Sequence, residues 1–276
     1  MVAGPEVAEL AGLMSCGEVA VLSGAGLSTE SGIPDYRGPS GLARQVTPMT
    51  YQTFVGDRQA RQRYWARSHV GWRRFAKAEP NDGHRSVAQL EDCGLVAGVV
   101  TQNVDGLHQA AGAQKVVELH GSLDRVTCLT CGDVSLRAEL ARRLREANPD
   151  FDPEVIAVNP DGDVDLQDEE IDRFHAVGCT VCGHGILKPD VVFFGETLPP
   201  ERVRQSYEVV EKSRLLLVLG SSLAVMSGRR FVVRARRLGI PVAIINQGAT
   251  REDATATLTI NAPLGTVLPL LCRQLL

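Results

Sequence analysis

Two cysteine pairs with the same short spacing stand out among the seven cysteines of the chain. Cys128 and Cys131 form one C-x-x-C pair, and Cys179 and Cys182 form the other. Two such turns can present four thiolates tetrahedrally to one Zn²⁺, which leaves no coordination position open for a substrate. The spacing therefore predicts one structural zinc ion rather than a disulfide framework.

A glycine-rich turn, GAGLSTESG, follows an apolar run near the N-terminus. Gly24 and Gly26 allow a tight strand-to-helix turn and a close approach to a pyrophosphate, while Ser28 and Thr29 can donate hydroxyls to phosphate or cap a helix. The third glycine of the dinucleotide fingerprint is missing, and no acidic residue ends a second strand about twenty positions on. These differences argue against a hydride-transferring dehydrogenase. The turn by itself is nearly as typical of an ordinary glycine-rich loop.

Two further motifs place polar side chains directly after apolar runs. Gln102, Asn103 and Asp105 follow LVAGVV, where amides can fix ribose hydroxyls or a carboxamide. His120 follows KVVEL and precedes a glycine, and a neutral imidazole there can serve as a general base. In isolation the first motif is an ordinary polar loop, and a lone histidine is more often structural. The other histidines are given no chemical role: His69, His84, His108, His175 and His184.

The scaffold that positions these motifs is predicted from alternating patterns. Strand-like runs at 18–24, 95–103, 115–121, 214–222 and 241–248 alternate with helical patterns at 5–16, 59–77, 84–94, 199–213 and 228–239. Such alternation predicts an α/β, Rossmann-like parallel sheet with helices on both faces. Ligands bind at the carboxyl ends of the strands in these sheets. The segments GAG, TQNVD, HG, GSS and NQG all fall there.

The alternation stops between residues 122 and 187, where the paired cysteines flank an acidic stretch. We therefore expect 122–187 to be an inserted zinc-binding module and 39–79 to be the helical segment of the small domain. The Rossmann-like domain is expected to comprise 1–38, 80–121 and 188–276. The segment NPDGDVDLQDEE is interpreted as a solvated acidic loop, because an EF-hand needs glycine where Val164 stands.

The composition is that of an average globular protein, with 44% hydrophobic and 22% charged residues. A formal net charge of −4 argues against general nucleic-acid binding, which needs a basic face. The N-terminal segment has no basic region followed by a long apolar stretch, and runs such as LLLVLG are too short to span a bilayer. We expect a cytoplasmic protein, with no membrane contact and a monomeric state.

Taken together, these motifs resemble those of the sirtuins, the NAD-dependent protein deacylases. The resemblance runs in the family's order from GAGLSTESGIPDYRG through TQNVDGLH, ELHGS, both C-x-x-C pairs and LKPDVVFFGE to GSSL and INQG. It covers nearly the whole chain. The long cysteine spacing with NPDGDV, and the helix containing YWARS, are most similar to the class II branch, and the lack of a transit sequence fits a bacterial member.

The resemblance implies that NAD is a co-substrate and assigns residues to it. Its pyrophosphate would lie at Gly24, Ala25 and Gly26, and the segment Asp35, Tyr36 and Arg37 would close over the nicotinamide ribose. Gln102, Asn103 and Asp105 would orient the ribose and carboxamide, with His120 as the catalytic base. The adenosine half would contact Gly220, Ser221, Ser222, Asn246, Gln247, Gly248 and the backbone of Leu264.

The same resemblance implies a reaction and a substrate class. The carbonyl oxygen of an acylated lysine attacks C1′ of the nicotinamide ribose, nicotinamide leaves, and His120 then draws a proton from a ribose hydroxyl. Water completes the reaction, which releases lysine and O-acyl-ADP-ribose. Val192 and Phe193 would pair with the substrate peptide as an added strand. Tyr64 and Arg67 form a Y-x-x-R that recognises acidic acyl groups in another sirtuin branch, although we favour an ordinary helix turn with an outward arginine.

Two other functions stay open at this point. The first is a mono-ADP-ribosyltransferase or NAD glycohydrolase on the same fold, which would release free ADP-ribose. The second is a non-catalytic, NAD-responsive module that binds proteins. The set of Asn103, Asp105 and His120 argues against the second, because a pure binder needs no base at a strand end. The preferred acyl group is left open.

Overall fold

The computed structural model describes residues 4–35, 48–158 and 163–276, with the side chain of Arg74 excepted. The chain divides into two compact units. The first unit comprises residues 1–43, 79–120 and 198–276, and the second comprises 44–78 and 121–197. No helix among the described residues is both long and apolar enough to cross a membrane.

A parallel six-stranded sheet forms the centre of the first unit. Its order is β11 (Leu258–Ile260), β10 (Val242–Ile245), β9 (Leu215–Leu219), β1 (Val19–Ser23), β2 (Val96–Thr101) and β3 (Val116–Glu118). The five predicted strands and the parallel arrangement are confirmed. The sequence analysis missed β11, whose three residues are too few to show a pattern.

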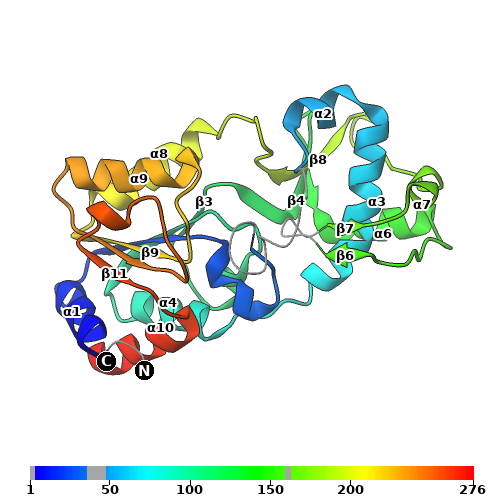
Figure 1. Cartoon of the computed structure of the whole chain (residues 1–276). Coiled ribbons are helices and arrows are strands. Elements are labelled where there is room, and N and C mark those ends of the chain that lie inside the picture. The colour runs from blue at the N-terminus through cyan, green and yellow to red at the C-terminus, as the bar shows by residue number, and fades with distance from the viewer. Residues whose placement is uncertain (1–3, 36–47, 159–162) are drawn as a thin grey trace. The chain divides into compact units, whose positions relative to one another are not determined.

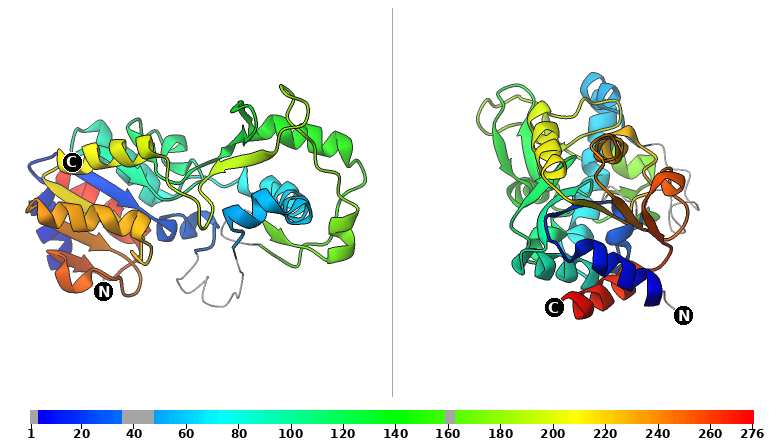
Figure 2. Two further views of the ribbon diagram at one scale, coloured as in Figure 1. Left: turned by 90° about the horizontal axis from the view of Figure 1, so that it is seen from above. Right: turned by 90° about the vertical axis from the view of Figure 1, so that its left-hand side faces the viewer.

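Both faces of this sheet are buried, as continuous apolar strands require. Val19 and Val21 of β1 point into one core, and Ala20 and Leu22 point into the other. The first core is covered by α1 (Gly4–Met14), α4 (Asp82–Asp92) and α10 (Leu264–Leu275), and the second by α8 (Pro200–Glu211) and α9 (Met226–Arg237) (Figure 1). The first and last helices, α1 and α10, lie side by side (Figure 2).

The strand order has one switch point. From β1 the chain moves outward through β2 to β3, and it later returns to place β9 on the other side of β1. Ser23 is in register with both Thr101 and Leu219, so three strands end at the same level. A switch point is where doubly wound sheets bind their ligands. Gly24, Gln102 and Gly220 follow these three strand ends directly.

The second unit contains the helix predicted at 59–77 and, within 122–187, strands and helices that the sequence analysis did not predict. A three-stranded antiparallel sheet has the order β5 (Val134–Leu136), β4 (Gly121–Cys128) and β8 (Leu187–Val191), and β6 (Ala157–Val158) pairs with β7 (Val164–Asp165). Its helices are α2 (Tyr51–Gly56), α3 (Arg58–Phe75), α6 (Arg137–Ala147) and α7 (Asp168–Asp172). The guanidinium of Arg137 lies 5.5 Å from the ring of Trp65 and 5.0 Å from that of Trp72.

Candidate active site and thiolate cluster

The turns that follow β1 and β9 pack directly against each other. The N–H of Gly24 donates to the carbonyl of Leu219 at 2.9 Å, and that of Gly26 donates to Gly220 at 2.8 Å. A Cβ on Gly26 would lie 2.9 Å from the Gly220 backbone, and Gly220 itself has a φ of +61°. The glycines are therefore needed for contact between two backbones. The sequence had suggested a tight turn and a close approach to a pyrophosphate, but not this contact with the turn after β9.

The segment after Gly24 differs from the expected start of an α-helix. It forms two 3₁₀ helices, η1 (Ala25–Leu27) and η2 (Thr29–Ser31), and the Thr29 hydroxyl donates to the Gly26 carbonyl at 3.0 Å. Glu30 accepts the N–H of Gly265 at 3.1 Å, in the first turn of α10. A carboxylate is favourable at a helix N-terminus. This bond ties the start of α10, with Leu264, to the glycine-rich turn.

Asn103, Ser28 and Asp105 form one hydrogen-bonded group after β2 and β1. The Asn103 amide donates to Ser28 Oγ at 3.0 Å and to the Gly24 carbonyl at 3.1 Å. The Ser28 hydroxyl donates to the Asp105 carboxylate at 2.6 Å, and the N–H of Leu107 donates to the other carboxylate oxygen at 3.0 Å. The only hydroxyl proton of Ser28 is therefore used within the protein, not offered to a phosphate as the sequence analysis considered.

His120 lies between β3 and β4 with a partner on each ring nitrogen. Nδ1 is 2.9 Å from the carbonyl of Gln102, which can only accept, so Nδ1 carries a proton. Nε2 is 3.0 Å from Ser227 Oγ, on the first turn of α9. In the neutral ring the basic lone pair is thus on Nε2. This is the tautomer that a general base needs for a hydroxyl approaching from that side.

The ionisation of both catalytic candidates is shifted toward the neutral form. Burial lowers the pKa of His120, and the positive charges of Arg202 and Arg230 lower it further. The hydrogen bond to the Gln102 carbonyl acts in the opposite direction but is outweighed. Burial likewise raises the pKa of Asp105, against its hydrogen bonds from Ser28 and Leu107. The imidazole is therefore neutral at physiological pH and able to accept a proton.

The residues expected around the adenosine half follow β9 and β10. Ser221 Oγ accepts from the Gln102 amide at 2.9 Å, and the Asn246 amide donates to the Gly248 carbonyl at 2.9 Å. Ser222 is half-buried, whereas Gln247 and Gly248 are exposed. Asp35, predicted to face the nicotinamide ribose, is buried. Tyr36 and Arg37, predicted for the same role, lie outside the described residues.

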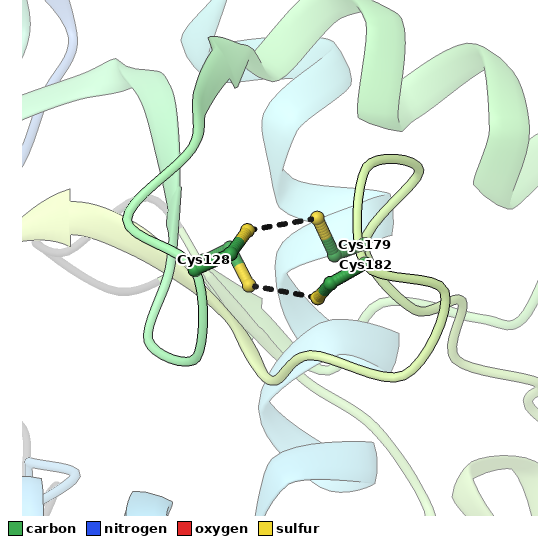
Figure 3. Close-up of side chains that lie close together, drawn as sticks. Cys128, Cys179 and Cys182 are labelled. Carbon is green, nitrogen blue, oxygen red and sulfur yellow. Dashed lines mark hydrogen bonds between the residues drawn. The ribbon is translucent and has the colours of Figure 1, made fainter.

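In the second unit, the two C-x-x-C turns bring their sulfurs together (Figure 3). Cys128 Sγ lies 3.7 Å from Cys182 Sγ, and Cys131 Sγ lies 3.7 Å from Cys179 Sγ. All four sulfurs are within 4.8 Å of one another. A zinc tetrahedron with bonds of about 2.3 Å has edges of about 3.8 Å, whereas a disulfide bond is about 2.05 Å long. The cluster therefore has the dimensions of a Cys₄ zinc site, as predicted.

The surroundings favour a thiolate at Cys128, whereas at Cys131 the hydrogen bond from the Asp133 backbone is outweighed by the neighbouring cysteine sulfurs, which raise the pKa of this thiol to about 12. Burial opposes ionisation of Cys128, but hydrogen bonds from the backbone N–H groups of Cys131 and Thr130 outweigh it and lower the pKa of this thiol to about 6. The N–H of Val181 donates to Cys179 Sγ at 3.3 Å. A Cβ on Gly185 would overlap Cys128 Sγ, so this position requires glycine. Four thiolates leave no open position, which fits a structural ion.

Comparison with known proteins identifies the family. The profile described as the Sir2 family matches residues 24–227. The NAD-dependent protein deacetylase 1 of Streptomyces coelicolor is 58% identical over 270 residues, covering 98% of this chain and 90% of that protein. A protein of the same name from Mycobacterium avium is 48% identical over 275 residues, covering 98% and 96%. The chain belongs to the Sir2 family.

Solved structures agree with this assignment. Sir2 with a p53 peptide and NAD⁺ superimposes with a TM-score of 0.75 at 28% identity, covering 96% of this sirtuin and 97% of that chain. Sir2 with a deacetylated p53 peptide and 3′-O-acetyl ADP-ribose gives a TM-score of 0.77 at 28% identity, covering 98% of each chain. The resemblance predicted from the ordered motifs is confirmed.

The segment predicted to bind the peptide follows β8 of this sirtuin, in the second unit. Val192 is half-buried and the Phe193 ring is buried. The N–H of Phe193 donates to the Glu196 carboxylate at 2.8 Å. The buried ammonium of Lys188 lies 3.2 Å from the same carboxylate and donates to the Val191 carbonyl at 2.5 Å. An ion pair between the buried Lys188 and the half-buried Glu196 thus fixes the loop that contains Val192 and Phe193.

Tyr64 and Arg67, on α3, are both engaged within the second unit. The Tyr64 ring is 4% exposed and packs edge to face on Phe54 at 5.4 Å. Arg67 forms ion pairs with Asp165 and, at 3.3 Å, with Asp163. Two carboxylates already neutralise the guanidinium. This arrangement favours a structural role over recognition of an acidic acyl group.

The sequence analysis missed Ser227 and a series of hydrogen-bonded polar groups that leads from two buried histidines to Asn103. The Asn81 N–H donates to His84 Nδ1 at 3.4 Å, which leaves the His84 proton on Nε2. The Ser23 hydroxyl donates to Thr101 Oγ1 at 2.9 Å, so His108 Nε2–H must be the donor to Ser23 at 2.8 Å. Among the described residues, His84 Nε2 and His108 Nδ1 have no hydrogen-bond partner. His84 Nε2 carries a proton and is a donor, whereas His108 Nδ1 carries a lone pair and is an acceptor. The centroids of the two rings are 5.2 Å apart.

This chain of polar groups ends at the active site, because Thr101 Oγ1 also accepts the N–H of Asn103 at 3.1 Å. Burial lowers the pKa of His84 to about 4 and that of His108 to about 3, so both rings are neutral. The motifs that contain these histidines gave no sign of their pairing, since His84 and His108 are brought together by packing of α4 on α5 (Leu107–Ala110). Helix-bound histidines had been interpreted as structural, which agrees with their burial.

Proposed function

We propose that this sirtuin is an NAD-dependent protein lysine deacylase that transfers an acyl group from lysine to ADP-ribose. The observation that carries the proposal is His120, a neutral imidazole with its basic nitrogen on Nε2 at the ligand-binding edge of the sheet. Relatives with 48% and 58% identity are named NAD-dependent protein deacetylases. Solved neighbours hold an acetylated or propionylated peptide, which supports acyl-lysine as the substrate class.

When bound, NAD supplies the ADP-ribose acceptor and nicotinamide as the leaving group. The residues present fit it, because amides, hydroxyls and a carboxylate converge at the switch point of the sheet, where such ligands bind. Asn103 and Asp105 are held rigid by Ser28 and the backbone, and we propose that they orient the ribose. His120 Nε2 then takes the proton of a ribose hydroxyl, and Nδ1–H stays on the Gln102 carbonyl throughout.

The second unit supplies the proposed peptide-binding segment. Val192 and Phe193 follow the end of β8 and would add the substrate peptide as a further strand. Lys188 and Glu196 fix this segment from its buried side. Because the guanidinium of Arg67 is already paired, we propose that neutral acyl groups are preferred. The cytoplasmic location, the monomeric state and the lack of nucleic-acid binding rest on composition and stay predictions.

The proposal is tested by mass spectrometry of lysine peptides that carry acetyl, succinyl, long-chain or lipoyl groups, incubated with and without NAD. We expect NAD-dependent loss of the acetyl group with formation of O-acetyl-ADP-ribose in equal amount. Consumption of NAD while every peptide stays intact would instead support the transferase or glycohydrolase alternative. Binding of NAD without any turnover would support the non-catalytic module.

A further inference from the structure

The hydroxyl of Ser227 stands where a substrate hydroxyl would have to stand relative to His120. Its Oγ lies 3.0 Å from Nε2, within the range of about 2.6–3.2 Å over which a general base takes a proton. Nδ1 is already committed to the Gln102 carbonyl. The lone pair of Nε2 is the only acceptor of the neutral ring, so Ser227 is its hydrogen-bond donor in this structure.

A contact between Gly228 and the Gln102 side chain fixes both hydrogen-bond partners of His120, the Gln102 carbonyl and the Ser227 hydroxyl. Gly228, the residue after Ser227, is packed against the Gln102 side chain, and a Cβ there would lie 2.5 Å from its oxygen. The Gln102 amide donates in turn to Ser221 Oγ at 2.9 Å and to the Ser23 carbonyl at 3.3 Å. The first turn of α9 and the segment after β2 therefore form one rigid clamp around the imidazole.

We propose that Ser227 is a positioning residue for His120, whose hydroxyl holds Nε2 in the direction from which the substrate hydroxyl arrives. This inference rests on the proposed deacylase function. A hydroxyl suits the role because it donates to the neutral ring and, after rotation, accepts from the protonated ring. Ser227 can thus hold the imidazole in this orientation until the substrate hydroxyl takes its place at Nε2, and can accept from the protonated ring once that position is free again.

The proposal makes a signed prediction for the titration of His120. The bond from protonated Nε2 to Ser227 is charge-assisted and stronger than the bond that the neutral ring accepts, so loss of the hydroxyl disfavours protonation. We expect Ser227→Ala to lower the pKa of His120 by about half a pH unit below its already reduced value. The other charges that act on the ring, Arg202 and Arg230, are unchanged in this variant.

The first measurement is an NMR titration of the histidine signals in the ligand-free protein, with His120 assigned by comparison with His120→Gln. Ser227→Thr keeps a hydroxyl and should retain the wild-type pKa. Ser213→Ala is the matched control, because it removes a buried hydroxyl of the same unit that donates only to the Val210 carbonyl. An unchanged His120 pKa in Ser227→Ala would overturn the proposal.

The second measurement separates the two halves of the proposed reaction. Exchange of labelled nicotinamide precedes the base step and should stay within about twofold in Ser227→Ala, whereas the rate of O-acetyl-ADP-ribose formation falls about three- to tenfold and Ser227→Thr restores it. An equal loss in both assays would show that Ser227 acts on NAD binding, which contradicts the proposal. If the wild-type protein shows neither reaction, the proposed function fails, and the titration alone decides on Ser227.

Discussion

The strand-edge site of the first unit and the thiolate cluster of the second are stabilised in opposite ways. At the strand edge the central polar groups have protein partners: Asn103, Ser28 and Asp105 bond to one another, and His120 bonds to two neighbours. In the cluster, four sulfurs lie within 4.8 Å of one another with a few backbone N–H donors, such as that of Val181, and among the described residues no positively charged side chain donates to them. The first site is preorganised by the fold, whereas the second needs an ion to be stable. Loss of one side chain should therefore impair chemistry in the first unit and folding in the second.

The largest effect is expected for Cys128→Ser. It removes a zinc ligand from a site whose ion contributes folding free energy, about 10–16 kcal/mol in isolated zinc-binding peptides. We expect zinc content to fall from one ion per chain to near zero, with loss of hydrogen-exchange protection in β4 and β8 but not in β1 and β9.

The control for this prediction is Cys93→Ser, because Cys93 is exposed and lies outside the cluster. It should keep its zinc and its melting temperature. Retention of both by Cys128→Ser would show that the second unit does not depend on the ion, and the contrast between the two sites would then fail.

The next effect concerns His120→Ala. Removal of a general base typically costs about 10²–10⁴-fold in rate. We expect kcat to fall by that factor while NAD affinity, measured by calorimetry, changes only a few-fold and zinc is retained. His175→Ala, at an exposed position, should have wild-type kcat. Full activity in His120→Ala would remove the base from the proposed mechanism.

The two sites also differ in how much of them was visible in the sequence. The cysteine cluster was predicted completely, because its ligands form two local repeats and metal geometry dictates the rest. The strand-edge motifs were placed correctly on one edge of the sheet, because each directly follows a strand. Ser227 gave no signal, since it is 107 positions from His120 and meets it only through the packing of α9. The short strands around the cluster were missed because their pairing leaves no local periodicity in the sequence. The buried guanidinium of Arg137, which lies over Trp65 and Trp72, was missed for the same reason.

Acid should test the preorganised site in a different way. Burial lowers the pKa of His84 to about 4 and that of His108 to about 3, both below the usual 6.5. Between the usual pKa of 6.5 and these lowered values, the unfolded chain binds more protons than the folded one. The stability that comes from the two neutral rings is therefore fully present above about pH 6.5 and is lost as the pH falls. At pH 5 each ring contributes a loss of about 2 kcal/mol.

Urea unfolding, followed through hydrogen exchange of β1 at pH 7 and pH 5, measures this loss within the first unit. His108→Gln removes one titrating ring and should reduce the slope with pH, whatever it does to stability at pH 7. An identical slope in wild type and variant would mean that His108 is not held neutral. Restricting the readout to β1 matters, because protonation of thiolates also releases zinc from the second unit at acid pH.

The smallest effect is expected for Arg67→Lys. Lysine keeps the charge opposite Asp163 and Asp165 but lacks the planar fork that binds a carboxylate through two hydrogen bonds. Because these aspartates already occupy the guanidinium, we expect the ratio of deacetylation to desuccinylation to change by less than about twofold. A selective loss of desuccinylation would show that Arg67 recognises acidic acyl groups. Arg67 would then bind the acyl group of the substrate. Its ion pairs with Asp163 and Asp165 instead indicate that it holds the acidic segment of its own unit.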